Sequence, residues 1–267
     1  MSAPLRVLFV SKPVVPPWHD GSKNLVRDVA THLRRARATV LTTPGAPPLG
    51  PHVTAEPVYK DAGRFRPSWL ANARVLARLV AGDPHDLWHF VFAPNPASSA
   101  AARIAITARR AAGFRGPIVQ TVASAPARFE GAARWLFGDH VVALSEHPRG
   151  RLFAAGAEAD RVSVIPPCAA APRPVTESEV QALRAELGLG GGPVALYPGD
   201  YEVSTGAQTV ARAVPALVRA VPGATVVFAC RPKTPRAAAA RVEVEAALRA
   251  AGALAATRHV GEVRDMA

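Results

Sequence analysis

Short apolar runs alternate with segments of helical periodicity along nearly the whole chain. In the first part of the chain the runs predict strands at Leu5–Val10, Ala38–Thr42, Asp86–Phe92, Pro117–Val122, His140–Leu144 and Val162–Ile165. Helices are expected between them, at residues 23–35, 68–81, 97–112, 128–136 and 146–155. The strands are apolar on both faces, which is typical of a parallel sheet covered by helices on each side. The alternation therefore predicts an α/β fold with a doubly wound sheet.

The pattern breaks after Ile165. Residues 166–178 hold four prolines and no periodicity, as in an interdomain linker, and a helix start is expected at Thr176 or Ser178. A second series follows: strands at Val194–Tyr197, Ala224–Ala229 and His259–Val260, with helices near 205–221 and 235–251. We expect one Rossmann-like domain over residues 1–168, a linker at 169–178 and a second such domain at 179–267.

The second series is short. Three strands at most leave an exposed edge and a half-covered core. The sequence therefore predicts that the second domain is incomplete here, because the chain or its gene is truncated.

Composition narrows the class of protein. Of the 267 residues, 49% are hydrophobic and 19% are charged, which excludes a disordered chain. No apolar run is long enough to span a membrane, and the N-terminus reads directly into a strand instead of a signal peptide, so we expect a cytoplasmic protein. The two cysteines, Cys168 and Cys230, form no CxxC pair, which excludes a zinc ribbon.

The charge balance favours anionic partners. The net charge is +12, and only four of the 32 basic residues are lysines. Phosphates, nucleic acid and an anionic membrane all fit this balance. Nucleic acid is the weaker choice, because the arginines are dispersed and no nucleic-acid-binding motif is present. Residues 64–70 mix arginines with Phe65 and Trp69, ahead of Arg74 and Arg78. They fit either an interfacial membrane helix or a packed helix with a solvated basic face.

Ligands of open parallel sheets bind beyond the carboxyl ends of the strands. After the first strand, a loop with Gly21 leads into a helix, where a backbone can approach an anion. The cleft candidates in this domain are Asp20, Gly21, Ser22, Lys23 and Asn95. His89 lies inside an apolar strand and is either a cleft-facing group or a core histidine. Neither GxGxxG nor GxxxxGK[ST] occurs, so a dinucleotide site and a P-loop are not supported.

In the second domain, polar residues follow two successive strands. The candidates are Gly199, Asp200, Ser204, Thr205, Arg231 and Lys233. Two cations at the end of one strand suit a diphosphate, although surface solvation would equally place them there. No paired-carboxylate, Ser/His/Asp or metal-ligand spacing is legible.

Several segments, in order and at sensible spacing, resemble the retaining glycosyltransferases of family 4, which have the GT-B fold. They are residues 5–33, 86–96, 117–124, 141–167 (VVALSEHPRGRLFAAGAEADRVSVIPP), 193–231 (PVALYPGD…VVFACR) and 259–266 (HVGEVRDM). The resemblance implies two Rossmann-like domains, the first for the acceptor and the second for a nucleotide-diphosphate sugar. It also implies transfer with retention and without a metal or other cofactor. The acceptor would be a glycan, a lipid-linked sugar or a small molecule. Peripheral contact with a membrane is compatible with such a transfer.

The sequence departs from the family pattern at functional positions. Asp200 and Thr205 stand where the family usually has an arginine and a lysine, and Val91 and Ala123 stand where it has histidines. The acidic EX7E segment of the family would lie beyond residue 267, so we expect the 267-residue chain to be inactive alone. Two hypotheses fit. Either Arg231 and Lys233 bind the diphosphate and His89 serves catalysis, or the protein is a non-catalytic binding protein with a GT-B-like fold.

Overall fold

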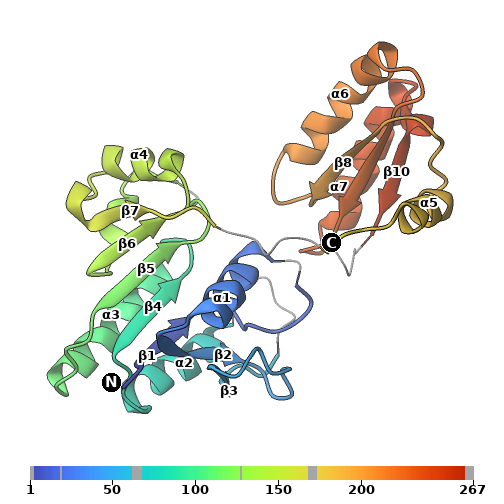
Figure 1. Cartoon of the computed structure of the whole chain (residues 1–267). Helices are drawn as coiled ribbons and strands as arrows, with labels where there is room; N and C mark the ends of the chain where they lie inside the picture. The colour runs from blue at the N-terminus through green and yellow to red at the C-terminus, as the bar shows by residue number, and fades with distance from the viewer. Residues whose placement is uncertain (1–2, 19, 62–67, 127, 168–172, 262–267) are drawn as a thin grey trace. The chain divides into compact units, whose positions relative to one another are not determined.

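A computed structural model describes residues 3–18, 20–61, 68–126, 128–167 and 173–261. The chain separates into two compact units, divided between residues 170 and 171 (Figure 1). In the first, seven strands form one sheet in the order β3-β2-β1-β4-β5-β6-β7, and in the second, three strands have the order β10-β9-β8. All strand pairs of the described residues are parallel. The prediction of an α/β fold with two parallel sheets is confirmed.

The elements of the first unit follow the sequence pattern closely. Its strands are β1 (Leu5–Val10), β2 (Ala36–Thr42), β3 (Val53–Pro57), β4 (Leu87–Val91), β5 (Ile118–Val122), β6 (His140–Ala143) and β7 (Val162–Val164). Its helices are α1 (Gly21–His32), α2 (Trp69–Ala81), α3 (Pro96–Ala111) and α4 (Glu146–Ala154), with 3₁₀ turns η1 (Ala132–Trp135) and η2 (Ala159–Arg161).

Two elements differ from the prediction. Strand β3 was missed because it lies at the sheet edge, pairs only with β2 and ends in Pro57, so it lacks a continuous apolar run. The helix expected at 128–136 is only the short turn η1, preceded by Gly131 in the left-handed region at φ 66°. A left-handed residue cannot continue an α-helix, so the apolar residues around it pack as a loop.

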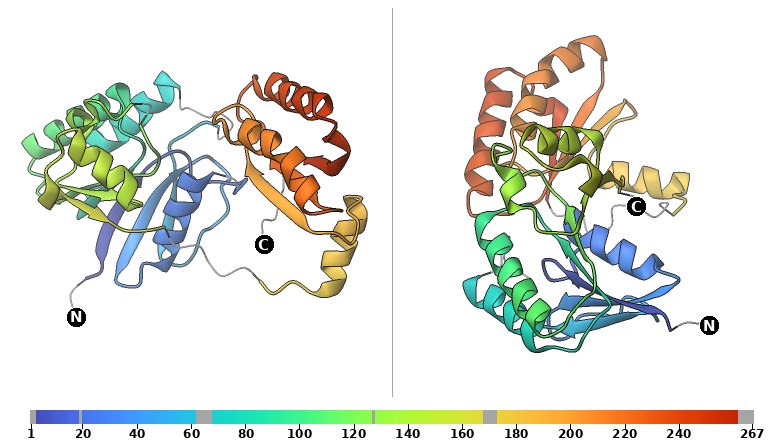
Figure 2. Two further views of the ribbon diagram at one scale, coloured as in Figure 1. Left: turned by 90° about the horizontal axis from the view of Figure 1, so that it is seen from above. Right: turned by 90° about the vertical axis from the view of Figure 1, so that its left-hand side faces the viewer.

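Helices cover the two faces of the large sheet unequally (Figure 2). Trp88, Phe90 and Ile118 pack beneath α2 and α3 on one face. Helix α4 covers the same face at β6 and β7. Val141 of β6 is in register with Phe90 of β4 through β5, so both side chains lie on one face, and Val141 packs in the same cluster as Leu152 of α4. On the opposite face α1 packs over β1 and β2. Among the described helices none other lies there, so the α1-side face of β4 to β7 is covered only at its border with α1.

The second unit is a smaller layer of the same kind. Its elements are α5 (Glu177–Glu186), β8 (Val194–Gly199), α6 (Gly206–Ala220), β9 (Thr225–Cys230), α7 (Ala237–Ala250), η3 (Leu254–Ala256) and β10 (Thr257–Val260). Thr176 caps α5 in a capping box with Glu179, which confirms one of the two predicted helix starts. Phe228 is the centre of the core beneath α6 and α7. On the other face Leu196 is 58% exposed, as expected for a sheet covered on one side.

Candidate functional site

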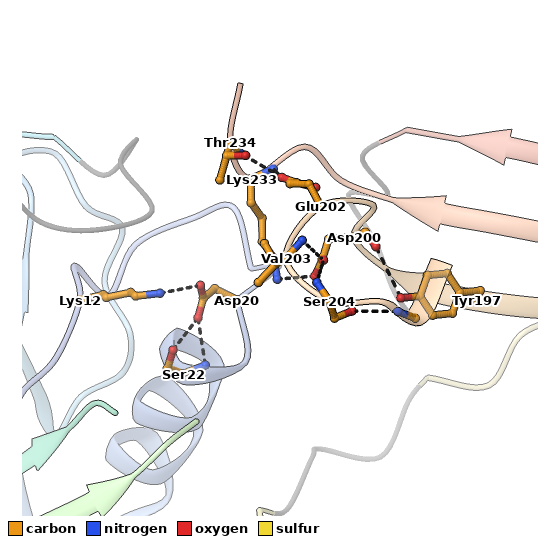
Figure 3. A network of polar contacts seen from close by, with 11 residues as sticks. Lys12, Asp20, Ser22, Tyr197, Asp200, Glu202, Val203, Ser204, Lys233 and Thr234 are labelled. Atoms are coloured by element: carbon orange, nitrogen blue, oxygen red, sulfur yellow. Dashed lines mark hydrogen bonds and ion pairs between the residues drawn. The ribbon is translucent and has the colours of Figure 1, made fainter. Parts of the chain in front are cut away.

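The loops that follow β8 and β9 carry the polar cluster of the second unit (Figure 3). These strands are parallel neighbours, and Gly199 pairs in register with Cys230. Asp200 and Arg231 therefore leave the sheet side by side, at the carboxyl edge where ligands of such sheets bind. The structure thus brings together the six residues that the sequence singled out in this unit.

Asp200 is buried, at 8% exposed, and is fully hydrogen-bonded. Its Oδ1 accepts from the backbone N–H groups of Val203 (2.9 Å) and Ser204 (3.2 Å). Its Oδ2 lies 2.8 Å from the Lys233 ammonium. Burial alone would raise the pKa of Asp200, but the Lys233 and backbone hydrogen bonds outweigh burial and lower it. Asp200 is therefore ionised at neutral pH and paired with Lys233.

Glu202 was not among the predicted site residues, yet it joins the two loops. Its Oε1 accepts from the backbone N–H groups of Lys233 (2.7 Å) and Thr234 (2.8 Å). Its Oε2 is buried, with no hydrogen-bond partner among the described residues. A carboxylate oxygen in that state is a ready acceptor for a hydroxyl or an amide. The signal in the sequence that could have pointed to Glu202 is the presence of a second acidic residue two positions after Asp200.

The charges of the two loops balance. Asp200 and Glu202 carry as many negative charges as Arg231 and Lys233 carry positive ones. The half-buried Arg231 also donates its backbone N–H to Gly199 across the strand pair, at 3.3 Å. The sequence led us to expect two cations facing a ligand, whereas one of them, Lys233, is held by a carboxylate.

The ring of Tyr197 fixes the β8–α6 turn. A Cβ atom on Gly199 would lie 2.7 Å from the Tyr197 ring, and one on Gly206 would lie 2.3 Å from its hydroxyl oxygen. A side chain at either place would therefore require the Tyr197 ring to shift. Ser204 and Thr205 lie exposed just before α6, and Thr205 makes no side-chain capping bond. The Gly206 N–H donates to Ser204 Oγ at 3.3 Å, and the next N–H groups of this 15-residue helix point toward the same edge.

A buried aromatic pair supports the same loop from below. The Tyr201 hydroxyl lies 2.7 Å from Nδ1 of His259 on β10. The His259 ring stacks on Phe228 at 5.0 Å between centroids and 4° between planes. Burial raises the pKa of Tyr201 and lowers that of His259, so both are neutral at pH 7. Neither residue stood out in the sequence.

In the first unit, the predicted loop residues Asp20 to Lys23 begin helix α1. Asp20 is its N-cap and accepts from the Ser22 N–H (3.0 Å) and from Lys12 Nζ (3.2 Å). Burial would raise the pKa of Asp20, but the hydrogen bonds from Ser22 and Lys12 lower it well below its ordinary value. A Cβ on Gly21 would meet open space, so backbone geometry does not require glycine there.

Lys23 corrects the sequence interpretation. We expected it in an exposed cleft loop, but it lies in the first turn of α1, is 5% exposed, and donates to the Val15 carbonyl at 3.2 Å. Asn95 is the N-cap of α3 and accepts from the Ser98 N–H at 2.9 Å. Both side chains therefore have structural contacts of their own.

His89 lies in the middle of β4, on the α1-side face. Its Nε2 is 2.7 Å from Thr121 Oγ1, and its ring lies 5.0 Å from that of Phe9. Burial lowers its pKa to about 4. His89 lines a mostly apolar pocket of about 600 Å³ between α1, strands β4 to β6 and residues 165–167. His89 is therefore neutral at pH 7 and lies in the middle of its strand, away from the carboxyl edge. This position agrees better with the core-histidine alternative, and the catalytic role of His89 stays a prediction.

The described residues contain neither a metal-binding cluster nor a membrane-spanning helix. No group of three or more His, Cys, Asp or Glu side chains is placed to hold a metal ion. No helix in the described part of the chain has the length and apolar character needed to cross a bilayer. Cys168 and residues 64–67, which the sequence singled out, lie outside the described residues.

Comparison with solved structures decides the fold. HepE from Anabaena, crystallised with UDP and glucose, matches with a TM-score of 0.69 and 18% identity, over 97% of this chain and 70% of that one. A UDP-forming trehalose-phosphate synthase from Burkholderia xenovorans, in complex with glucose-6-phosphate, matches with a TM-score of 0.68 and 13% identity, over 98% and 75%. The fold is GT-B.

Other comparisons agree on the fold and add no family. The lipopolysaccharide outer core galactosyltransferase WaaB matches with a TM-score of 0.56 and 12% identity, over 97% of this chain and 68% of that one. No protein-family model and no curated protein matches the sequence. The GT-B architecture implied by the sequence resemblance is thus confirmed, whereas membership of family 4 stays a prediction.

Proposed function

We propose that this chain binds a nucleotide-diphosphate sugar at the loops after β8 and β9, as the donor for a metal-independent glycosyl transfer with retention. The proposal rests on one arrangement. The N-terminus of α6, where Ser204 Oγ accepts from the Gly206 N–H and Thr205 adds no side-chain cap, lies at the carboxyl edge beside the strand end that carries Arg231 and Lys233. Oriented N–H groups next to cations are what a diphosphate requires. Solved GT-B structures crystallised with UDP-glucose or UDP support the choice of ligand class.

Lys233 has to change partner in this scheme. In the free protein its ammonium pairs with Asp200 at 2.8 Å. A diphosphate brings more negative charge than one carboxylate, so the ammonium turns toward it, and Asp200 keeps the two backbone donors of its own loop. As the sugar leaves, negative charge grows on the diphosphate, and the cations and N–H groups stabilise it. In this scheme donor binding uncovers the buried Oε2 of Glu202, which then accepts from a hydroxyl of the donor.

The acceptor is assigned to the first unit, in line with the family 4 resemblance. Its carboxyl edge offers the segment around Asp20, Gly21 and Ser22 at the start of α1, and Asn95 at the start of α3. Open space above Gly21 leaves room for a bound group. A glycan, a lipid-linked sugar or a small molecule would fit this description.

The alternative function is non-catalytic binding. It is favoured by the Asp200–Lys233 pair and by Thr205, which leave the loops with balanced charge where the family usually has cations. A protein of this kind would bind the nucleotide without transferring the sugar.

Calorimetry with UDP and UDP-glucose tests the donor site. We expect Arg231→Gln and Lys233→Gln each to weaken UDP binding by about tenfold or more, the value of one charge-assisted phosphate contact. Arg236→Gln, which removes an exposed charge from the same segment, is the matched control. No UDP binding by the unaltered chain, or equal binding by all three variants, would refute the proposed site.

A positive transfer assay separates the two functions. Released UDP and the anomeric configuration of the product, read by NMR, report turnover and retention. Measurable transfer would exclude the non-catalytic alternative and would also contradict our expectation that the 267-residue chain is inactive alone. An inverted product would refute retention while leaving the donor site intact.

A further inference from the structure

The outer surface of the α2–α3 layer is unusually apolar. In α2, all six exposed residues are apolar: Trp69, Leu70, Ala73, Ala77, Val80 and Ala81. Trp69 is 81% exposed, more than any other large apolar side chain of the described residues. On α3, Ile104 is 59% exposed on the corresponding outward side. We call these exposed side chains of α2, together with Ile104, the outer patch.

The two helices present this patch together. They pack against each other within the first unit and lie on the same face of the large sheet. Val75 and Leu79 of α2 and Ala102 and Ala105 of α3 point into the core. At 100° per residue, the side of each helix opposite those residues is therefore the side that faces away from the sheet. A helix at the surface of a soluble protein ordinarily carries polar residues there.

Only positive charge borders the patch on the helices themselves. Helices α2 and α3 contain five arginines and no acidic residue. The exposed Arg103 donates to the carbonyls of Arg134 and Leu136. Arg109, whose Nε is buried, donates to the carbonyl of Val80 on α2. Backbone carbonyls orient a guanidinium without cancelling its charge. Arg78 and Arg110, by contrast, are paired with Glu56 and Asp139.

We propose that the outer patch docks on an anionic lipid surface. An exposed tryptophan beside aliphatic side chains and unneutralised arginines is the composition of an interfacial helix, in which the ring enters the headgroup layer and the arginines meet lipid phosphates. The structure thereby favours the hypothesis of an interfacial membrane helix over that of a packed helix with a solvated basic face, because the solvent-facing side of α2 is its apolar side. The proposal does not depend on the proposed function.

Co-sedimentation with vesicles tests the docking. We expect the chain to bind vesicles made of equal parts phosphatidylcholine and phosphatidylglycerol, and to bind pure phosphatidylcholine vesicles far more weakly. Trp69→Ala should lower the partition coefficient by about tenfold or more, from the apolar area withdrawn from the bilayer. Trp69→Phe should retain most of the binding. Arg74→Gln should weaken binding by about fivefold, the contribution of one cation near an anionic surface.

Controls keep the result interpretable. Val242→Ala removes an apolar side chain that is 64% exposed on α7 and should leave vesicle binding unchanged. Circular dichroism of each variant verifies that the fold is kept. Vesicle binding that is absent, or equal in Trp69→Ala and the unaltered chain, would overturn the proposal. A Trp69-dependent dimer in sedimentation velocity without vesicle binding would also overturn it, in favour of self-association through the patch.

Discussion

Replacing Asp200 with asparagine should destabilise the second unit and at the same time strengthen anion binding. Asparagine keeps Oδ1 as acceptor for the N–H groups of Val203 and Ser204, but it loses the charge that faces Lys233. A hydrogen bond between charged groups contributes about 1.5–3 kcal/mol. Because both side chains are mostly buried, at 19% and 11% exposed, solvent screens the pair only partly, and we expect a loss in this range.

The same change should tighten UDP binding. It removes a carboxylate from the ligand's surroundings and releases the Lys233 ammonium, which no longer has to exchange partners. A gain of about tenfold corresponds to 1.4 kcal/mol, slightly below the lower bound of the lost ion pair. The opposite signs of the two effects distinguish this prediction from a general loss of structure, which would weaken both.

The sequence offers a way to observe the second unit alone. All four tryptophans, at positions 18, 69, 88 and 135, lie in the first unit, so tryptophan fluorescence follows only that unit in urea. Circular dichroism follows both units, and the transition it shows beyond the fluorescence change belongs to the second. Asp28→Asn, at an ion pair with Arg27 in the first unit, is the matched control and should shift the first-unit transition while leaving that of the second unit unchanged.

pH supplies an internal check. Because the pKa of Asp200 is lowered by folding, its contribution to stability is present above the unfolded value of 3.8 and is lost as the pH falls through the folded value. Asp200→Asn should lack this loss. An unchanged midpoint for the second unit, or weaker UDP binding by Asp200→Asn, would refute the reasoning about the pair.

Two further predictions concern single residues. Burial lowers the pKa of His89 to about 4, so His89 binds a proton more readily in the unfolded chain, and the first unit should lose about 2 kcal/mol of stability between pH 7 and pH 5. In His89→Gln the urea midpoint detected by fluorescence should lack that part of the pH dependence. An equal pH dependence in the variant and the unaltered chain would contradict this prediction. Gly206→Ala places a Cβ against the Tyr197 hydroxyl and should cost the second unit about 1–3 kcal/mol, with partial recovery in the double variant with Tyr197→Phe; no recovery would show that the collision lies elsewhere.

Most strands were predictable from the sequence, including the edge strands β7, β8 and β10, whereas the edge strand β3 was not. β1 and β4 to β6 were recognised because apolar side chains fill both of their faces. β3 pairs on one side only and is interrupted by Pro57, so its pattern resembles a loop. Helix α5 was placed correctly because the capping box at Thr176 is a local signal.

For the candidate site, the placement of the residues on the sheet was predictable and their mutual contacts were not. Which strands end at the ligand-binding edge follows from the order of βα units, and this placed Asp200 and Lys233 on adjacent loops. That the two side chains pair with each other depends on contacts across 33 residues, which no local pattern encodes. Glu202 bonds the backbone of the neighbouring loop for the same reason, and the burial of Lys23 depends on the path of residues 13–18 above α1.

The edges of the two sheets bear on how copies of this chain meet. β3 ends in Pro57, β7 has three residues, and β8 carries Pro198 within its span. Proline offers no N–H to an incoming strand, and a three-residue strand offers too few groups to template one. Backbone-mediated joining of copies along these strands is therefore disfavoured. Apart from the edge strand β10 (Thr257–Val260), which carries no proline, side-chain surfaces such as the outer patch are left as the route for contacts between copies. Self-association in concentrated solution should therefore depend on Trp69 more than on β3, β7 or β8.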